Sequence, residues 1–225
     1  MTITVNINGR QITAPEGKTI LEVARENGIE IPTLCFIEDL PPLGACRLCV
    51  VEVEGSRTLV GSCHTPITEG MKIQTHSPRV LEARKVLVEL MLASHPDSCL
   101  VCAAANCCEL RKIAADLNIG LPRFKIKRHY HQIEEANPAI VRDMSKCVLC
   151  RRCIAACRNL KGEKLFSMAY RGFESKVICG LDQPVSGEDT CRDCDTCISL
   201  CPTGALIKPI KIGGQKKGPV VYLKG

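Results

Sequence analysis

The sequence contains C147-V-L-C-R-R-C-I-A-A-C157 and C191-R-D-C-D-T-C-I-S-L-C201, two stretches with the same cysteine spacing, and a proline follows the second. In each stretch, two residues separate the first three cysteines and three residues precede the fourth, so the pattern is C-x2-C-x2-C-x3-C. Three thiols at this spacing fit on one tight loop, whereas the fourth lies on the helix that leaves the loop. Each set of three therefore needs a fourth ligand from another part of the chain.

This spacing is that of bacterial two-cluster ferredoxins, in which the fourth cysteine of each run binds the other cluster. We therefore expect two 4Fe–4S clusters with crosswise ligands. One set is Cys147, Cys150, Cys153 and Cys201, and the other is Cys157, Cys191, Cys194 and Cys197. A zinc ribbon is the alternative, but zinc ligands usually come as paired C-x2-C elements. Two triplets, each with a distant fourth cysteine, favour iron–sulfur clusters over zinc.

Four cysteines nearer the N-terminus form a second pattern: Cys35, Cys46, Cys49 and Cys63. They keep the C-x2-C element and the distant fourth cysteine of plant-type 2Fe–2S sites, with a longer first gap. We expect a 2Fe–2S cluster here, with Gly44 allowing backbone N–H groups to approach the sulfur atoms and offset the cluster charge. Zinc is again the alternative, because it shares the C-x2-C element.

The sequence around these four cysteines predicts a small α+β domain over residues 1–78. Asn-Gly at 8–9, between two alternating segments, predicts a β-hairpin over 3–14. Residues 17–28 are expected to form a helix, and strands are expected directly after Cys49 and directly before Cys63. The side chains of the helix that face the core are expected to be Ile20, Leu21, Val23 and Ala24.

A third pattern, His95-x3-Cys99-x2-Cys102-x5-Cys108, follows a helix expected over 79–94. That helix is expected to end near the histidine, because Pro96 disfavours helical backbone before it. Its inward side chains are expected to be Val80, Ala83, Leu87, Leu90 and Met91. One imidazole and three thiolates also suit tetrahedral zinc, and a core histidine is a third interpretation. Because the pattern lies between a 2Fe–2S pattern and a two-cluster pattern, we favour a 4Fe–4S cluster that links the others.

The rest of the chain divides around these patterns. The histidine pattern belongs to a helical segment over 79–118, with a second short helix at about 109–118. Residues 119–140 are basic and irregular and are interpreted as a linker. The two-cluster ferredoxin domain is expected over 141–207, and a basic tail over 208–225.

Composition agrees with several small metal-stabilised domains. The chain has 225 residues, 17 cysteines, few aromatic residues and no tryptophan, so one deep core is unfavourable. The first residues do not resemble a secretory signal, and no apolar stretch approaches the roughly 18 residues of a membrane helix. We therefore expect a cytoplasmic protein without membrane insertion, in which clustered cysteines bind metal rather than form disulfides.

The formal net charge of +6 suggests nucleic-acid binding only while the metal is ignored. If each oxidised cluster core carries roughly 2+, the four sites with their ligands sum to about −7. The basic side chains are then mostly counter-charge, and nucleic acid is not an expected partner.

The order of these patterns resembles a known family. It is similar to the N-terminal region shared by the large iron–sulfur subunit of respiratory complex I, FeFe hydrogenases and NAD-linked formate dehydrogenases. It most resembles the small diaphorase subunit of NAD(P)-linked hydrogenases, over residues 1 to about 207. The resemblance implies a plant-type ferredoxin-like (β-grasp) first domain and a 4Fe–4S cluster at the histidine pattern. It places Cys108 in register as a ligand and leaves Cys107 and Cys179 as spare thiols.

The resemblance also implies a function. The chain is expected to be a non-catalytic electron-transfer subunit with one 2Fe–2S and three 4Fe–4S clusters and no flavin. Its expected partners are a flavin-containing NAD(P)-binding subunit and a hydrogenase or formate dehydrogenase catalytic subunit, with ferredoxin as a further candidate. Two complete ferredoxin runs favour the hydrogenase and formate dehydrogenase branch over complex I. Because no cysteine follows Cys201 in the sequence, the catalytic domain of the larger relatives is expected to be missing from it.

Two alternatives remain at this stage. One is a stand-alone multi-cluster ferredoxin, which would purify without a stable complex. The other is a zinc-bound nucleic-acid module, which would be colourless and free of sulfide. The sequence leaves open the terminal substrate, the choice of NAD or NADP, and electron bifurcation.

Overall fold

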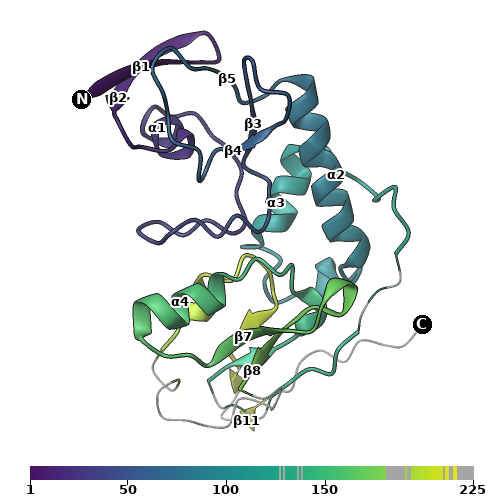
Figure 1. Cartoon of the computed structure of the whole chain (residues 1–225). Coiled ribbons are helices and arrows are strands. Elements are labelled where there is room, and N and C mark those ends of the chain that lie inside the picture. Colours follow the sequence, from purple (N-terminus) through teal and green to yellow (C-terminus); the bar gives the residue numbers. More distant parts are fainter. Residues whose placement is uncertain are drawn as a thin grey trace. The chain divides into compact units, whose positions relative to one another are not determined.

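The structure is a computed structural model that describes residues 1–126, 128, 130–135, 137, 139–180, 191, 194–209, 211, 212, 215 and 216. The chain divides into two compact units (Figure 1): unit 1 is Met1–Leu90 with Ile113–Pro122, and unit 2 is Met91–Lys112 with Arg123–Gly225. Most of the tail expected over 208–225 lies outside the described residues. Among the helices of the described residues, none is both long and apolar enough to cross a membrane.

Unit 1 is built on a five-stranded mixed sheet with the strand order β2-β1-β5-β3-β4. β1 pairs antiparallel with β2 and parallel with β5, while β3 pairs antiparallel with both β5 and β4. The strands are β1 Thr2–Ile7, β2 Arg10–Pro15, β3 Val50–Val53, β4 Val60–Gly61 and β5 Lys72–Gln74. Together with helix α1 this sheet makes unit 1 an α+β structure, as the sequence predicted.

The hairpin between β1 and β2 turns at Asn8 and Gly9, as the sequence predicted. Both residues have positive φ, 54° and 86°, which is the backbone that a two-residue type I′ turn requires. The side chain of Asn6 fixes the turn, because its Oδ1 accepts a hydrogen bond of 2.8 Å from the Gly9 N–H. The register that follows places Val5 opposite Ile12.

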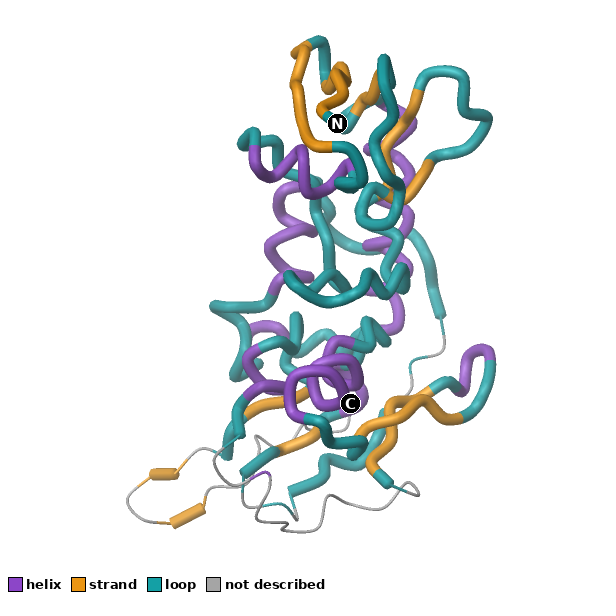
Figure 2. The backbone as a smooth tube through the Cα atoms, turned by 60° about the vertical axis from the view of Figure 1, so that its left-hand side comes forward, coloured by secondary structure: helices purple, strands orange, loops and turns teal. Residues whose placement is uncertain are grey.

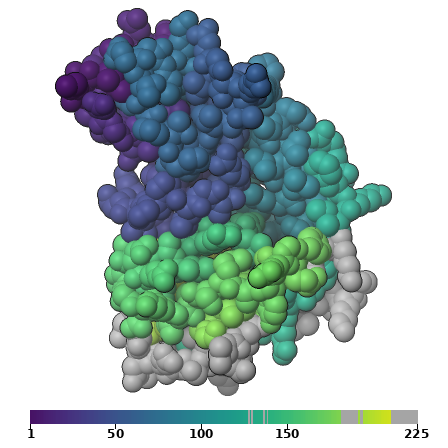
Figure 3. Space-filling view, viewed as in Figure 1, coloured from purple at the N-terminus to yellow at the C-terminus, as the bar shows by residue number. Residues whose placement is uncertain are grey.

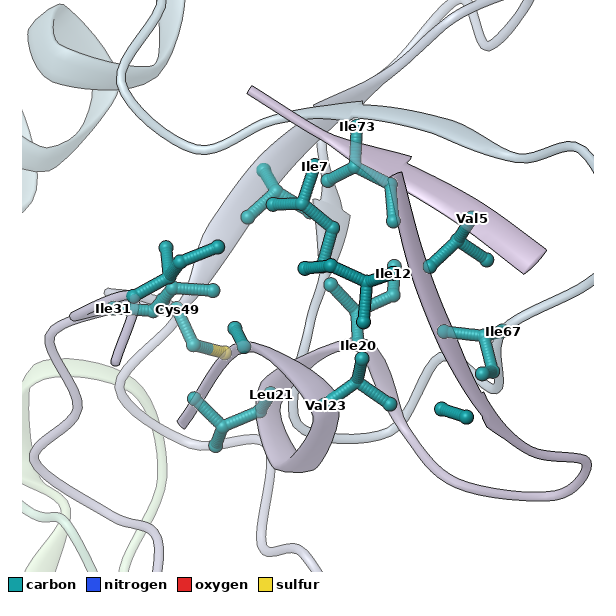
Figure 4. Close-up of a cluster of buried hydrophobic side chains, with 14 of the residues drawn as sticks. Val5, Ile7, Ile12, Ile20, Leu21, Val23, Ile31, Cys49, Ile67 and Ile73 are labelled. Atoms are coloured by element: carbon teal, nitrogen blue, oxygen red, sulfur yellow. The ribbon is translucent and has the colours of Figure 1, made fainter. Parts of the chain in front are cut away.

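Helix α1, Ile20–Glu26, covers the sheet of unit 1. A capping box begins it: the Thr19 side chain accepts from the Glu22 N–H, and the Glu22 carboxylate accepts from the Thr19 N–H. Its expected inward residues are fully buried, and Figure 4 shows Ile20 and Leu21 in one cluster with Ile7 and Ile73 from the strands. The predicted core face of this helix is therefore confirmed.

The long helix α2, Pro78–Ser94, lies where the sequence placed a helix, but its buried face differs from the prediction. Val80, Arg84 and Val88 are buried at intervals of four residues, whereas Ala83 and Leu87 are only partly buried and Leu90 is 39% exposed. The prediction was wrong because it counted only apolar residues, and the centre of the buried stripe is an arginine. Helix α3, Glu109–Asp116, is the short second helix expected at about 109–118.

Unit 2 has small sheets and short helices. β6 pairs antiparallel with β9, and β7 pairs antiparallel with β8 to form a hairpin whose tip carries the 3-10 turn η3 (Figure 2). Helix α4 packs against β7, and in the space-filling view they share one surface (green and yellow-green in Figure 3). The elements are η1 Cys99–Val101, β6 Val141–Arg142, η2 Met144–Lys146, α4 Arg152–Lys161, β7 Phe166–Ala169, η3 Gly172–Glu174, β8 Lys176–Cys179, α6 Thr196–Ser199, β9 Leu206–Ile207, β10 Lys211–Ile212 and β11 Gln215–Lys216.

The first ferredoxin run folds as a tight loop that leads into α4. Leu149 and Arg151 have left-handed backbones, with φ of 53° and 64°, so the chain turns sharply between the first cysteines of the run. α4 begins at Arg152 and carries both Cys153 and Cys157. The expectation that the fourth cysteine lies on the departing helix is confirmed for Cys157 but is wrong for Cys201, which lies after the end of α6 at Ser199. The third cysteine of each run, expected on the loop, lies on the helix instead.

Candidate metal centres

The four N-terminal cysteines, called here the Cys35 site, are gathered in unit 1. All four are buried, with exposures of 2–5%: Cys35, Cys46, Cys49 and Cys63. The pKa of Cys63 is raised by its hydrogen bond to Cys49, by burial and by the charges of the other three cysteines. A thiol influenced by all three others lies in one group with them, which is the grouping that a 2Fe–2S cluster would need.

Backbone and side-chain donors stabilise negative charge at this site. The Leu34 N–H donates to Cys46 Sγ at 3.3 Å. The pKa of Cys49 is lowered to about 6, mainly by a hydrogen bond from the Cys63 thiol and further by the Cys63 backbone N–H. Such donors favour thiolate, which is the form that binds iron.

Gly44 serves this site for a different reason from the one expected. A Cβ built there would meet no atom within 4 Å, so close approach to sulfur does not require a glycine at this position. Its φ is +61°, a left-handed backbone that favours glycine over residues with a side chain. Gly44 therefore shapes the enlarged loop before Cys46 through its backbone conformation.

A buried cation beside the Cys35 site was missed in the sequence. Arg84 on α2 is 1% exposed, and its guanidinium donates to the carbonyl oxygens of Leu48 at 3.0 Å and Val50 at 2.9 Å. These two residues flank Cys49, so Arg84 holds the backbone on both sides of that cysteine, directly before β3. Burial lowers the pKa of Arg84 to about 10, while the charge of Cys49 opposes this shift. Arg84 is four residues from both Val80 and Val88, and this helical spacing is the sequence signal that could have predicted its burial.

The histidine pattern, called here the His95 site, lies in unit 2. The pKa of Cys108 is raised by burial, and the charges of Cys102 and Cys99 add to this effect, so the three thiols lie close together. The neighbouring Cys107 is exposed, and its thiol contacts the Ala104 carbonyl oxygen at 3.6 Å. This arrangement supports Cys108 rather than Cys107 as the third thiol ligand, an assignment that stays a prediction.

His95 has the features of a metal ligand. It is 9% exposed, and its Nδ1 lies 3.2 Å from the Pro96 carbonyl oxygen. If Nδ1–H donates there, Nε2 is left with a free lone pair. Nε2 is buried and has no hydrogen-bond partner within the described part of the chain. A buried acceptor without a partner is costly, and coordination of a metal would remove that cost.

Lys146 lies near both the His95 ring and the backbone that packs against a thiol of the same site. The charge of Lys146 is near enough to affect the pKa of His95, which burial lowers below its usual value. A Cβ at Gly204 would lie 2.9 Å from Cys102 Sγ and 3.5 Å from the Lys146 Cδ, so only glycine fits between them. The donor set of one neutral imidazole and three thiols therefore fits a metal centre.

The two ferredoxin runs are grouped crosswise. One cavity, of about 20 Å³, is lined by the four cysteines of the Cys147 site, together with apolar residues such as Met144 and Leu206. A second cavity, of about 280 Å³, is lined by the four cysteines of the Cys157 site, together with residues such as Ile140 and Lys161. The Cys147 site is Cys147, Cys150, Cys153 and Cys201, and the Cys157 site is Cys157, Cys191, Cys194 and Cys197.

In the absence of metal, burial favours the protonated form of several of these thiols. It raises the pKa of Cys147 to about 11 and that of Cys150 and Cys197 to about 12, with further increases from neighbouring cysteines. The pKa of Cys194, which lies near the surface, is instead lowered by the Thr196 side chain. Coordination to iron would supply the positive charge that converts buried thiols to thiolates.

Basic residues next to the first run differ in their burial. Arg151 is exposed, whereas Lys146 and Arg152 are buried. The Arg152 guanidinium binds the Glu109 carboxylate through both terminal nitrogens and also donates to the Leu200 carbonyl oxygen at 3.4 Å. Lys146 and Arg152 are therefore not solvated surface cations.

Over the described residues, no three His, Cys, Asp or Glu side chains converge closely enough to hold one metal ion.

Three family models match the chain in succession. Residues 1–78 match a 2Fe-2S iron-sulfur cluster binding domain. Residues 84–123 match the NADH-ubiquinone oxidoreductase-G iron-sulfur binding region, and residues 137–207 match the ferredoxin-like domain of NADH-quinone oxidoreductase subunit 3. Each model covers one of the cysteine patterns described above.

Individual relatives agree with these models. The chain is 39% identical over 212 residues to NADP-reducing hydrogenase subunit HndD of Solidesulfovibrio fructosivorans, covering 92% of this chain but 36% of that protein. It is 30% identical over 209 residues to the gamma subunit of NAD-reducing hydrogenase HoxS of Cupriavidus necator, covering 92% of this chain and 88% of that protein. A chain of a solved NAD+-reducing NiFe hydrogenase in the H2-reduced state aligns with a TM-score of 0.79 at 25% identity, over 92% of this chain and 87% of that one. The chain thus spans about a third of the first relative and most of the second.

Proposed function

Because the chain belongs to the family of iron–sulfur subunits of NAD(P)-linked hydrogenases, which shares its iron–sulfur binding region with NADH-quinone oxidoreductases, we propose that it relays single electrons between two partner subunits. One partner is a flavin-containing subunit that binds NAD(P), and the other is a hydrogenase catalytic subunit. The observation that carries the proposal is the gathering of its cysteines into four separate groups.

Four clusters are proposed, with the Cys35 site holding 2Fe–2S and the other three sites holding 4Fe–4S. Each cluster would accept and release one electron at a time. The chain's own residues would hold the clusters, exclude water and balance their charge. Support comes from the burial of the ligands of the Cys35 site and from the unpartnered Nε2 of His95.

A relay is favoured over an enzyme because the sequence carries no motif of a site for two-electron chemistry. Hydride transfer needs an acceptor such as a flavin, and the sequence has no G-x-G-x-x-G fingerprint and no phosphate loop. We therefore propose that NAD(P) and flavin are bound by a partner. Ferredoxin is a further candidate partner, and the clustered free cysteines favour the cytoplasm.

The isolated chain and its complex provide the test. Purified without oxygen, the chain alone should be brown, reducible by dithionite, free of flavin and unable to couple NADH oxidation to viologen reduction. Addition of the flavin subunit should restore reduction of its clusters by NADH. Flavin bound to the chain, or NADH:viologen turnover by the chain alone, would overturn the proposal.

Mass spectrometry of the subunits that co-purify with the chain identifies the catalytic partner. A hydrogenase subunit is the expected result. A formate dehydrogenase subunit would replace hydrogen with formate as the terminal substrate, and a chain that purifies without any partner would favour a stand-alone ferredoxin.

A further inference from the structure

Unit 2 contains a buried salt bridge, and neither of its two residues belongs to the proposed ligands of a cluster. The Lys146 ammonium lies 2.9 Å from Asp143 Oδ2, and the two side chains are 7% and 5% exposed. Removing two charges from water costs on the order of several kcal/mol per ion, and the attraction of the pair often fails to repay that cost. A pair of this kind is weak evidence for stability, so its presence in the interior calls for another explanation.

The pair is held rigidly by the backbone around it. Both residues belong to the turn η2 or directly precede it, and the Asp143 N–H donates to the Ala205 carbonyl oxygen at 2.8 Å. The Lys146 carbonyl oxygen accepts from Thr203 Oγ1 at 2.8 Å, and the Ser145 N–H donates to Asp143 Oδ1 at 3.2 Å. The charges are therefore fixed in place rather than mobile on the surface.

The pair lies between two of the four sites. On one side, the charges of Lys146 and Asp143 both act on His95, and the Lys146 side chain approaches the Gly204 backbone that packs against Cys102. On the other side, Lys146 is followed directly by Cys147, the first ligand of the Cys147 site. A charge in this position acts on both sites through a poorly screened interior.

We propose that Lys146 and Asp143 are positioning residues that set the reduction potential of the His95 site. The ammonium stabilises the additional negative charge that arrives with an electron, and the carboxylate holds the ammonium in place and limits its effect. The inference rests on the proposed function, because it requires a cluster at the His95 site. It assigns opposite effects to two residues that form one salt bridge.

Substitutions of the pair test this assignment through potentials rather than activity. EPR-monitored redox titrations at constant pH would compare the wild-type chain with Lys146→Met and Asp143→Asn, each with its clusters intact. Lys146→Met should reduce the one-electron reduction constant of the His95 site at least tenfold, equivalent to about 59 mV. Asp143→Asn should shift the constant in the opposite direction, and the double variant should lie between the two.

Two controls separate a charge effect from a packing effect. Lys146→Arg keeps the charge and should keep the potential close to that of the wild type. Lys164→Met removes an exposed lysine of the same unit, and solvent screening should leave the His95 site unchanged. If Lys146→Met loses its cluster, Lys146→Arg and Asp143→Asn still decide the question by their own shifts.

The outcomes distinguish the role of the Lys146–Asp143 pair from the proposed function of the chain as an electron relay. Four intact clusters with shifts in the same direction for both single variants, or with no shift, would overturn the role of the pair and leave the relay standing. A wild-type chain without a cluster at the His95 site would instead overturn the proposed function.

Discussion

Unit 1 and unit 2 bury different kinds of side chain. The main core of unit 1 contains fifteen buried hydrophobic residues among the described ones, of which two are the cysteines Cys49 and Cys63. The main core of unit 2 contains ten, of which four are cysteines: Cys157, Cys179, Cys191 and Cys197. Unit 1 also has a five-stranded sheet, whereas the described sheets of unit 2 have two strands each.

This difference predicts that the stability of unit 2 depends more strongly on bound metal than the stability of unit 1. Isoleucine, leucine and valine side chains stabilise unit 1 by the hydrophobic effect whether or not a cluster is present. In unit 2 much of the interior consists of thiols around cavities, so cluster binding should supply a large part of its folding free energy. The following predictions test this comparison, beginning with the largest expected effect.

Removal of all clusters should unfold unit 2 and leave unit 1 folded. The clusters would be removed with a chelator and an oxidant, and hydrogen exchange would be followed by mass spectrometry. The amides of α4 should lose protection by orders of magnitude, because metal ligation by Cys153 and Cys157 is expected to supply much of the free energy that holds this helix in place. The amides of β1 should remain protected, because they lie over the apolar core.

The untreated chain is the control for this experiment. Equal loss of protection in both units would show that unit 1 also needs its cluster, and equal retention would show that unit 2 has a sufficient apolar core.

Cys108→Ser should remove one cluster from unit 2, and Cys107→Ser should remove none. The first thiol lies with Cys99 and Cys102, whereas the second contacts a carbonyl oxygen at the surface. Iron analysis should find a loss of about four iron atoms per chain for Cys108→Ser. The reverse pattern would show that the ligand register is displaced by one residue.

Ile7→Ala should destabilise unit 1 by about 2–5 kcal/mol without affecting the clusters of unit 2. Ile7 is fully buried in the sheet and contributes to the cluster of Figure 4. Hydrogen exchange of the β1 and β2 amides measures the loss. Ile7→Val is the matched control, with an expected cost of about 0.5–1.5 kcal/mol. A cost below that of the valine variant would mean that the core does not depend on this side chain.

Thr19→Ala should have a smaller effect, about 1 kcal/mol, because it removes the N-cap of α1. Thr19→Ser keeps the oxygen and should cost much less. Chemical denaturation of the two variants, followed by far-ultraviolet circular dichroism, gives the difference. Equal stability of the two variants would indicate that the capping box does not stabilise the helix.

Much of unit 1 could be predicted because its signals are local. Asn8-Gly9 specifies a turn through two positive φ angles, and the apolar spacing of α1 specifies a helix face. β5 was not predicted, because three residues are too few to show alternation and its parallel pairing with β1 joins distant segments. The β7–β8 hairpin was also missed, because the segment between the two cysteine runs has no strong turn signal.

The grouping of the cysteines of the two ferredoxin runs could be predicted, because a cluster constrains the spacing of its ligands, while their role as ligands stays a prediction. The crosswise sets are those that line the two cavities, and the family resemblance is confirmed by the relatives. Buried charges could not be predicted in the same way. Arg84 and Lys146 resemble ordinary surface cations in sequence, and only the folded chain reveals the carbonyl and carboxylate oxygens that they contact.

Iron, zinc and acid-labile sulfide in the chain purified without oxygen test the central claim most directly. The account predicts about 14 iron atoms and about as many sulfides per chain, from one 2Fe–2S and three 4Fe–4S clusters, together with EPR signals after reduction. A colourless chain that holds about four zinc ions and no sulfide would contradict it, because the same cysteines would then bind single metal ions.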